Sequence, residues 1–136
     1  MQLRSRLAPL VDSLGITVLV VDDDPSIRLL CRVNLELEGC EVREAGSLDR
    51  ARSELGQGGV DVVLLDVHVG SRDGAELLAE LRRDHPGLPV AMLTGSAGHA
   101  VLEERQADAV LFKPFTLEQL TGTVRALTAR AAGTPG

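Results

Sequence analysis

Aromatic residues are almost absent from this chain of 136 residues, which has two phenylalanines, no tyrosine and no tryptophan. Proteins that bind single-stranded nucleic acids stack the bases on such side chains, so this class is disfavoured. The net charge of −6 also argues against a general nucleic-acid-binding surface. We therefore expect no direct contact between this chain and nucleic acid.

Long apolar runs and cysteine clusters are lacking as well. No apolar run approaches the roughly 18 residues that a membrane-spanning helix needs, so no membrane association is expected. Pro9 and Asp12 interrupt the start of the chain, which makes it a poor signal peptide. The two cysteines, Cys31 and Cys40, have no metal-ligand spacing. They are interpreted as reduced structural thiols of a cytoplasmic protein.

The composition, 44% hydrophobic and 25% charged, is that of an ordinary globular domain. The length is sufficient for one domain. We expect an N-terminal extension or linker at residues 1–15, one domain at residues 16–130, and a C-terminal tail at residues 131–136. Leucines at positions 3, 7, 10 and 14 have helical spacing, but Pro9 would break or kink a helix there.

Short β-branched runs alternate with amphipathic segments along the domain. The expected strands are Thr17–Val21, Glu41–Ala45, Val60–Leu65, Pro89–Leu93 and Ala109–Phe112. The expected helices start after Asp24, after Ser47, at Ala75, at Ala97 and after Thr116. In the first helix, Ile27, Leu30, Val33 and Leu37 share the apolar face. Five strands alternating with five helices predict an α/β fold, a doubly wound parallel sheet covered on both faces.

Polar side chains stand where the predicted strands end. Asp22 and Asp23 follow the first strand, and Asp66 closes the third. Thr94 follows the fourth strand and Lys113 the fifth. In open sheets of this kind, sites form beyond the carboxyl ends of the strands. Each residue alone has an ordinary explanation as a cap or a turn residue, but five such groups at matching strand ends indicate a site.

Three neighbouring carboxylates repel one another unless a cation lies among them. Their hard oxygen atoms suit Mg²⁺, which binds one or two carboxylates together with phosphate oxygens. A lysine is a point-charge phosphate binder, and a carboxylate can act as the nucleophile that forms an aspartyl phosphate. The pattern therefore predicts phosphoryl transfer onto Asp66, with Lys113 and a cation neutralising the phosphoryl oxygens.

Four motifs carry a resemblance to a known family: VLVVDDDPSIR at Val18–Arg28, LLD-x₆-DG at Leu64–Gly74, MLTGS at Met92–Ser96 and FKPF at Phe112–Phe115. They resemble the receiver domain of two-component response regulators, the CheY-like superfamily, over roughly residues 16–130. The resemblance implies a flavodoxin-like fold with strand order 2-1-3-4-5.

The resemblance also assigns roles to the residues of the site. It implies that Asp66 is the phosphoacceptor and that Thr94 and Lys113 bind the phosphoryl group, with a cis bond between Lys113 and Pro114. Asp22, Asp23, Asp66 and the backbone carbonyl of His68 would bind Mg²⁺, for which Mn²⁺ or Ca²⁺ could substitute. His68 and Ser96 would flank the phosphoryl group.

The function implied is that of a phosphoacceptor signalling domain, not of an enzyme beyond its own phosphorylation and dephosphorylation. Its phosphodonor would be a histidine kinase or a histidine phosphotransfer protein, and its other partners a second copy or an output domain. An alternative is a receiver-fold scaffold or dimerisation module with weak switching. A hydrolase with an aspartyl-phosphate intermediate is disfavoured, because no insertion is large enough to form a substrate pocket.

Two positions depart from the family's pattern. Val69 and Gly70 stand where the family usually has Met-Pro, so we expect a looser loop after Asp66. Val110 stands three residues before the lysine, where the family commonly has a Tyr or Phe whose movement reports phosphorylation. A valine has no ring to move, which puts the usual threonine–aromatic coupling in doubt.

Overall fold

The computed structural model describes residues 14–95 and 107–132. Its elements, in chain order, are β1 (Thr17–Val21), α2 (Pro25–Leu37), β2 (Glu41–Ala45), α3 (Leu48–Gly56), β3 (Val62–Asp66), β4 (His68–Val69), β5 (Arg72–Asp73), α4 (Ala75–Asp84), β6 (Val90–Thr94), β7 (Ala109–Phe112) and α6 (Leu117–Ala132).

One five-stranded parallel sheet forms the centre of the fold, in the order β2-β1-β3-β6-β7. β6 and β7 are the fourth and fifth predicted strands, so the predicted α/β class and the strand order 2-1-3-4-5 are confirmed. Within the described residues the chain forms four helices, and the expected helix at Ala97–Arg105 lies outside them, as does Ser96.

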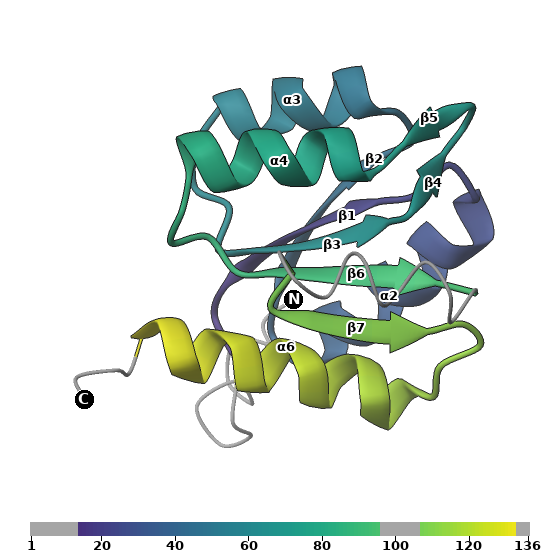
Figure 1. The fold of residues 1–136 in the computed structure, drawn as a ribbon. Coiled ribbons are helices and arrows are strands. Elements are labelled where there is room, and N and C mark those ends of the chain that lie inside the picture. The colour runs from purple at the N-terminus through teal and green to yellow at the C-terminus, as the bar shows by residue number, and fades with distance from the viewer. Residues whose placement is uncertain (1–13, 96–106, 133–136) are drawn as a thin grey trace.

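Helices cover both faces of this sheet, with α3 and α4 on one side and α2 and α6 on the other (Figure 1). Side chains along β1 alternate between the two faces of the sheet. Leu19 and Val21 pack under α3 and α4, whereas Val18 and Val20 pack under α2 and α6. All four side chains are fully buried. The continuous apolar run of a strand buried on both faces is thus explained.

The apolar face predicted for α2 is correct at Ile27 and wrong at Leu30, Val33 and Leu37. The residues that pack toward the sheet are Ile27, Cys31 and Leu35, whereas Val33 and Leu37 are 46% and 76% exposed. The sequence of α2 contains two apolar stripes at helical spacing, and either could have faced a core. The end of β1 and the packing of α6 select the stripe that contains Cys31.

Local capping signals are confirmed at three helix starts. Asp24 accepts a hydrogen bond from the Ser26 amide at 2.8 Å, and Pro25 begins α2. The Ser47 hydroxyl accepts from the amide of Arg50 at the start of α3. Thr116 and Gln119 form a reciprocal capping box before α6, with bonds of 2.8 and 3.0 Å.

The described structure includes a few residues of the segments predicted to flank the domain. The amide of Leu14 donates to the Glu38 carbonyl at 2.9 Å, and its side chain packs against the core under α2. At the other end, α6 continues to Ala132, two residues into the segment predicted as a tail. No helix in the described ranges is both long and apolar enough to cross a membrane.

Candidate functional site at the carboxyl ends of the strands

The parallel register brings the predicted site residues to one edge of the sheet. Val21 pairs with Leu65, so Asp22 and Asp66 each stand one residue beyond this pair. Asp66 is the last residue of β3, and Thr94 is the last residue of β6. Lys113 follows β7, and its amide donates to the Thr94 carbonyl at 2.8 Å. The strands therefore deliver all these residues to the same end.

Three carboxylates gather at this edge. Asp22, Asp23 and Asp66 each offer an oxygen, and these oxygens lie within 4.8 Å of one another. Asp22 is fully buried, Asp66 is 8% exposed, and Asp23 lies at the surface. A set of hard oxygen ligands that opens to solvent on one side suits Mg²⁺, which keeps several of its waters. The residues present thus fit the cation that the sequence predicted.

Lys113 reaches two of these carboxylates. Its Nζ atom lies 2.9 Å from Oδ2 of Asp22 and 3.4 Å from Oδ1 of Asp66. Burial disfavours the ammonium, but the hydrogen bond and charge of Asp22, together with those of Asp66, raise the pKa of Lys113 overall. The Lys113 ammonium therefore stays protonated beside the two acids. From this position it can also contact the oxygens of an incoming phosphoryl group.

The surroundings of Asp66 disfavour its ionised form. Burial is the main cause, the negative charge of Asp22 is the second, and Lys113 opposes both, so that the pKa of Asp66 rises from 3.8 to about 6. A carboxylate with a raised pKa is the better nucleophile once it is ionised, and a bound cation would restore its ionisation. Perturbed carboxyl groups of this kind are typical of functional sites.

The segment after Asp66 is folded more regularly than its sequence predicts. β4 and β5 are strands of two residues each, and they form an antiparallel hairpin in which His68 pairs with Asp73 and Val69 with Arg72. Gly70 provides the turn, with a φ of 65° that suits glycine. Val69 is buried, at 2% exposure, and anchors the hairpin to the core under α3 and α4. The looser loop expected after Asp66 stays a prediction, and the sequence pattern did not predict the hairpin.

Gly74 is a residue of the site that sequence reasoning missed. The Asp73-Gly74 pair ends the LLD-x₆-DG motif, and Asp73 accepts a hydrogen bond from the Ala75 amide at 2.9 Å. Gly74 itself packs on the main chain at the end of β3. A Cβ atom at this position would lie 2.1 Å from the Asp66 carbonyl oxygen. The DG motif seven residues after an acid was the available signal.

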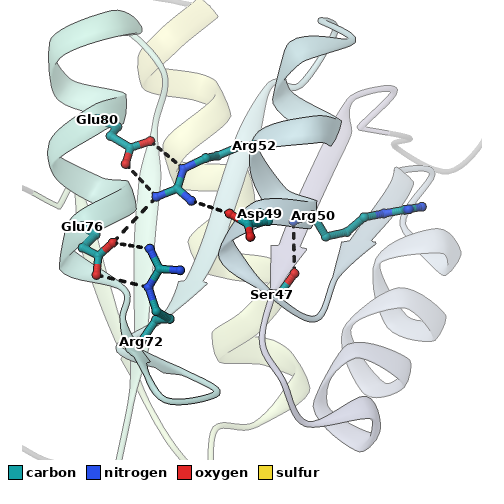
Figure 2. A network of polar contacts seen from close by, with 7 residues as sticks. All are labelled: Ser47, Asp49, Arg50, Arg52, Arg72, Glu76 and Glu80. Carbon is teal, nitrogen blue, oxygen red and sulfur yellow. Dashed lines mark hydrogen bonds and ion pairs between the residues drawn. The ribbon is translucent and has the colours of Figure 1, made fainter.

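Charged side chains connect the hairpin to α3 and α4 (Figure 2). Arg72 of β5 donates to Glu76 at 2.7 Å, and Arg52 of α3 binds Glu80 of α4 through two bonds of 2.9 and 2.8 Å. Arg52 also contacts Asp49 at 2.8 Å. Exposed pairs of this kind contribute little individually, about 0–1 kcal/mol each. Their arrangement nevertheless links the loop beside Asp66 to the neighbouring helices.

The other residues to which the resemblance assigns a role differ in their exposure to solvent. The Thr94 side chain is buried, at 3% exposure, and His68 is exposed in β4. The Lys113–Pro114 bond is cis, as the resemblance implied. On β7, Val110 is half-buried and Phe112 is 50% exposed. The roles assigned to these residues, including the backbone carbonyl of His68 as a ligand, stay predictions.

Comparisons with known proteins identify the class. The sequence model of the response regulator receiver domain matches residues 18–125. The chain belongs to this family, and it is a receiver domain of the two-component signalling type. Its site at the carboxyl ends of β1, β3, β6 and β7 lies at the edge where α/β folds of this order bind their ligands.

Particular relatives are similar over most of this chain. The probable transcriptional regulatory protein TcrX of Mycobacterium tuberculosis is 35% identical over 129 residues, which are 90% of this chain and 54% of TcrX. The sensor kinase CckA of Brucella abortus is 40% identical over 80% of this chain and 12% of CckA. The chain thus spans about half of the first relative and a small part of the second.

A solved structure supports the same assignment. The receiver domain of NtrX from Brucella abortus superimposes with a TM-score of 0.78 and 34% sequence identity, over 82% of this chain and 97% of that chain. The receiver domain protein from Methanospirillum hungatei, described as CheY-like, has a TM-score of 0.80 at 27% identity, over 85% of this chain and 95% of that chain.

Proposed function

We propose that this domain accepts a phosphoryl group on Asp66 in a Mg²⁺-dependent reaction and passes the signal on through protein–protein contacts. The observation that carries the proposal is the grouping of Asp66 with two further acids, whose oxygens lie within 4.8 Å of one another, and with Lys113. A lone strand-end acid would need no such neighbours.

Each residue of the site has a separate role in the proposed in-line displacement at phosphorus. An Oδ atom of Asp66 attacks the phosphorus, a new O–P bond forms, and the P–N bond to the donor imidazole breaks. The electron pair of the P–N bond stays on that nitrogen, and the imidazole leaves as the neutral base because its other ring nitrogen already carries a proton. Mg²⁺, when bound by Asp22, Asp23, Asp66 and the carbonyl of His68, supplies positive charge to the phosphoryl oxygens. Lys113 and the hydroxyl of Thr94 would contact the remaining oxygens.

The phosphodonor is a histidine kinase or a histidine phosphotransfer protein in the cytoplasm. A surface for such a donor adjoins the site. Four apolar side chains of α2 form the α2 apolar stripe: Leu29, Leu30, Val33 and Leu37, which are 38–76% exposed. Because α2 starts directly after the acidic pair, a protein that reaches Asp66 would cover the first turns of this stripe.

Phosphorylation by a small donor tests the chemistry. Incubation with acetyl phosphate and Mg²⁺ should add one phosphoryl group, detected by phosphate-affinity electrophoresis or intact mass. Asp66→Asn and chelation with EDTA should each abolish the product, whereas Asp73→Asn, seven residues on and outside the acid cluster, should leave it. A wild-type protein that binds Mg²⁺ but accepts no phosphoryl group would contradict the proposal.

A protein donor tests the docking surface separately. Leu29→Glu should slow transfer from an autophosphorylated histidine kinase that labels the wild-type chain, because an apolar contact of about 1–2 kcal/mol is lost and a charge is buried. Labelling by acetyl phosphate should not change. Equal transfer to both proteins would exclude the α2 apolar stripe as the donor's contact surface.

A scaffold or dimerisation module is the second candidate, favoured by Val110 at the position of the usual switch aromatic. Phe112 does not replace it, since its side chain is half exposed at the end of β7. Light scattering before and after phosphorylation distinguishes the two functions. A phosphorylated protein with unchanged oligomeric state and unchanged partner binding would favour the scaffold.

A further inference from the structure

A second-turn arginine of α2 reaches back to the peptide bond that joins the two acids after β1. Nη1 of Arg28 donates to the Asp22 carbonyl at 2.7 Å. This oxygen belongs to the peptide unit between Asp22 and Asp23, so the hydrogen bond fixes the plane of that unit. The direction in which the Asp23 side chain leaves the backbone depends on this plane.

The guanidinium is itself held in place by β2. Its Nε atom donates to Oε1 of Glu44 at 3.1 Å, and the Arg28 and Glu44 side chains are only 21% and 25% exposed. Gly46 makes room for it, because a Cβ atom there would lie 3.0 Å from Nη1. The amide of Asp22 donates to the Ala45 carbonyl at 3.0 Å, so both sides of Asp22 are tied to the end of β2.

The carboxylate of Asp22 does not depend on this arginine. Its two oxygens accept from the amide of Asp24 at 2.9 Å and from Lys113 at 2.9 Å. The carboxylate that the fixed peptide unit orients is therefore that of Asp23, which lies at the surface. Groups that orient metal ligands in this way commonly change metal affinity by about 10- to 100-fold.

We propose that Arg28 is a positioning residue of the cation site, which fixes the peptide unit between Asp22 and Asp23 and so holds the Asp23 carboxylate ready for a divalent cation. The inference rests on the proposed function, because it needs a cation at the acid cluster. It adds a residue that contacts neither the cation nor the phosphoryl group.

The sign of the effect separates positioning from simple electrostatics. Arg28 carries a positive charge near the acid cluster, so its removal by itself should strengthen the binding of a cation. Loss of positioning should weaken it. Arg32 provides the matched control, because it also binds Glu44 but makes no contact with the Asp22 carbonyl.

Calorimetric titration of the full chain with Mg²⁺ alone, without a phosphodonor, measures the effect. Arg28→Ala should raise the Kd for Mg²⁺ roughly tenfold. Arg32→Ala should change it by no more than about twofold. Arg28→Lys should rescue part of the loss. Its single ammonium can donate to the Asp22 carbonyl, but it cannot bind that carbonyl and Glu44 through two separate nitrogen atoms as the guanidinium does. Thermal unfolding in EDTA checks that each variant folds.

The Mg²⁺ affinity of a double variant at Arg28 and Asp23 distinguishes positioning of Asp23 from a general structural role of Arg28. If Arg28 acts through Asp23, the double variant Arg28→Ala/Asp23→Asn should bind Mg²⁺ about as weakly as Asp23→Asn alone. The inference is overturned if Arg28→Ala, or Arg28→Met where the alanine variant does not fold, binds Mg²⁺ as the wild type does. It is also overturned if the two losses add.

The result also separates this inference from the proposed function. A wild-type chain that binds no Mg²⁺ would overturn both. A wild-type chain that binds Mg²⁺ and is phosphorylated on Asp66, together with an Arg28→Ala variant of equal affinity, would overturn only the role of Arg28.

Discussion

Replacing Asp66 by its uncharged isostere, asparagine, should stabilise the fold at neutral pH in the absence of divalent cations. Asp66 is only 8% exposed beside the fully buried Asp22, and its pKa is raised to about 6. At pH 7 the folded protein must therefore keep a charge that the site disfavours. The asparagine side chain of the variant Asp66→Asn would fill the same space without this charge.

The magnitude follows from the difference between the pKa of the folded protein, about 6, and the ordinary value of 3.8. Because one pKa unit corresponds to about 1.4 kcal/mol, ionised Asp66 lowers the free energy of unfolding by about 3 kcal/mol at pH 7. A raised carboxyl pKa means that the folded state binds more protons. The contribution of protonated Asp66 to the free energy of unfolding is thus fully present below pH 3.8 and is lost as the pH rises through about 6.

Urea unfolding followed by circular dichroism, in EDTA at several pH values, measures this difference. At about pH 7.5, Asp66→Asn should be about 3 kcal/mol more stable than the wild type, and the advantage should shrink toward zero near about pH 4. Mg²⁺ should narrow the gap, because it binds the folded wild type and stabilises it by mass action. Asp73→Asn is the control, since the asparagine carbonyl can accept the same hydrogen bond from the Ala75 amide.

A variant Asp66→Asn that is no more stable than the wild type at neutral pH in EDTA would refute the reasoning. It would show that Asp66 is ionised at little cost, with Lys113 balancing the burial and the repulsion from Asp22. An advantage that does not depend on pH would also count against it, because only the titration of the Asp66 carboxyl gives the window from about pH 4 to about pH 6.

Three further predictions concern rate, packing and thiol chemistry. At a Mg²⁺ concentration below saturation, labelling by acetyl phosphate should fall as the pH drops through about 6, the pKa of Asp66, and excess Mg²⁺ should move the midpoint to lower pH; a flat profile down to about pH 4 would contradict this. Gly74→Ala should destabilise the fold by about 2 kcal/mol or more in thermal melts, because its Cβ atom would lie 2.1 Å from the Asp66 carbonyl, while Gly87→Ala, with nothing within 4 Å, should cost under about 1 kcal/mol. Burial raises the pKa of Cys31 to about 12 and that of Cys40 to about 11, so neither thiol should react with iodoacetamide at about pH 8 in the folded protein, and both should react in urea.

Much of the fold could be predicted from local patterns. The five strands, the caps at Asp24 and Ser47, and the capping box of Thr116 and Gln119 depend on near neighbours in the chain, and all of them are confirmed. In α4, Leu77, Leu78 and Leu81 recur at helical spacing, and all three are buried. These features are local, so their physical causes are visible in a short stretch of sequence.

The failures come from contacts between distant segments. In α2, the sequence offered two apolar stripes, and only the packing of α6 and the sheet decides that Cys31 and Leu35 are buried while Leu37 is exposed. The hairpin of β4 and β5 depends on Val69 finding a place in the core, which its sequence neighbours do not reveal.

By itself, the sequence determined which chemical groups the site contains, because acids, a lysine and a threonine at the ends of four strands are a property of the order of residues. Only the tertiary structure decided how these groups affect one another. The parallel register places Asp22, Asp66 and Lys113, up to 91 residues apart, within hydrogen-bonding distance or close to it. Burial at that edge then raises the pKa of Asp66, and Arg28 and Gly74 acquire roles through their contacts with the main chain of Asp22 and Asp66. Desolvation and close packing are properties of the assembled sheet, so no short stretch of the chain could have shown them.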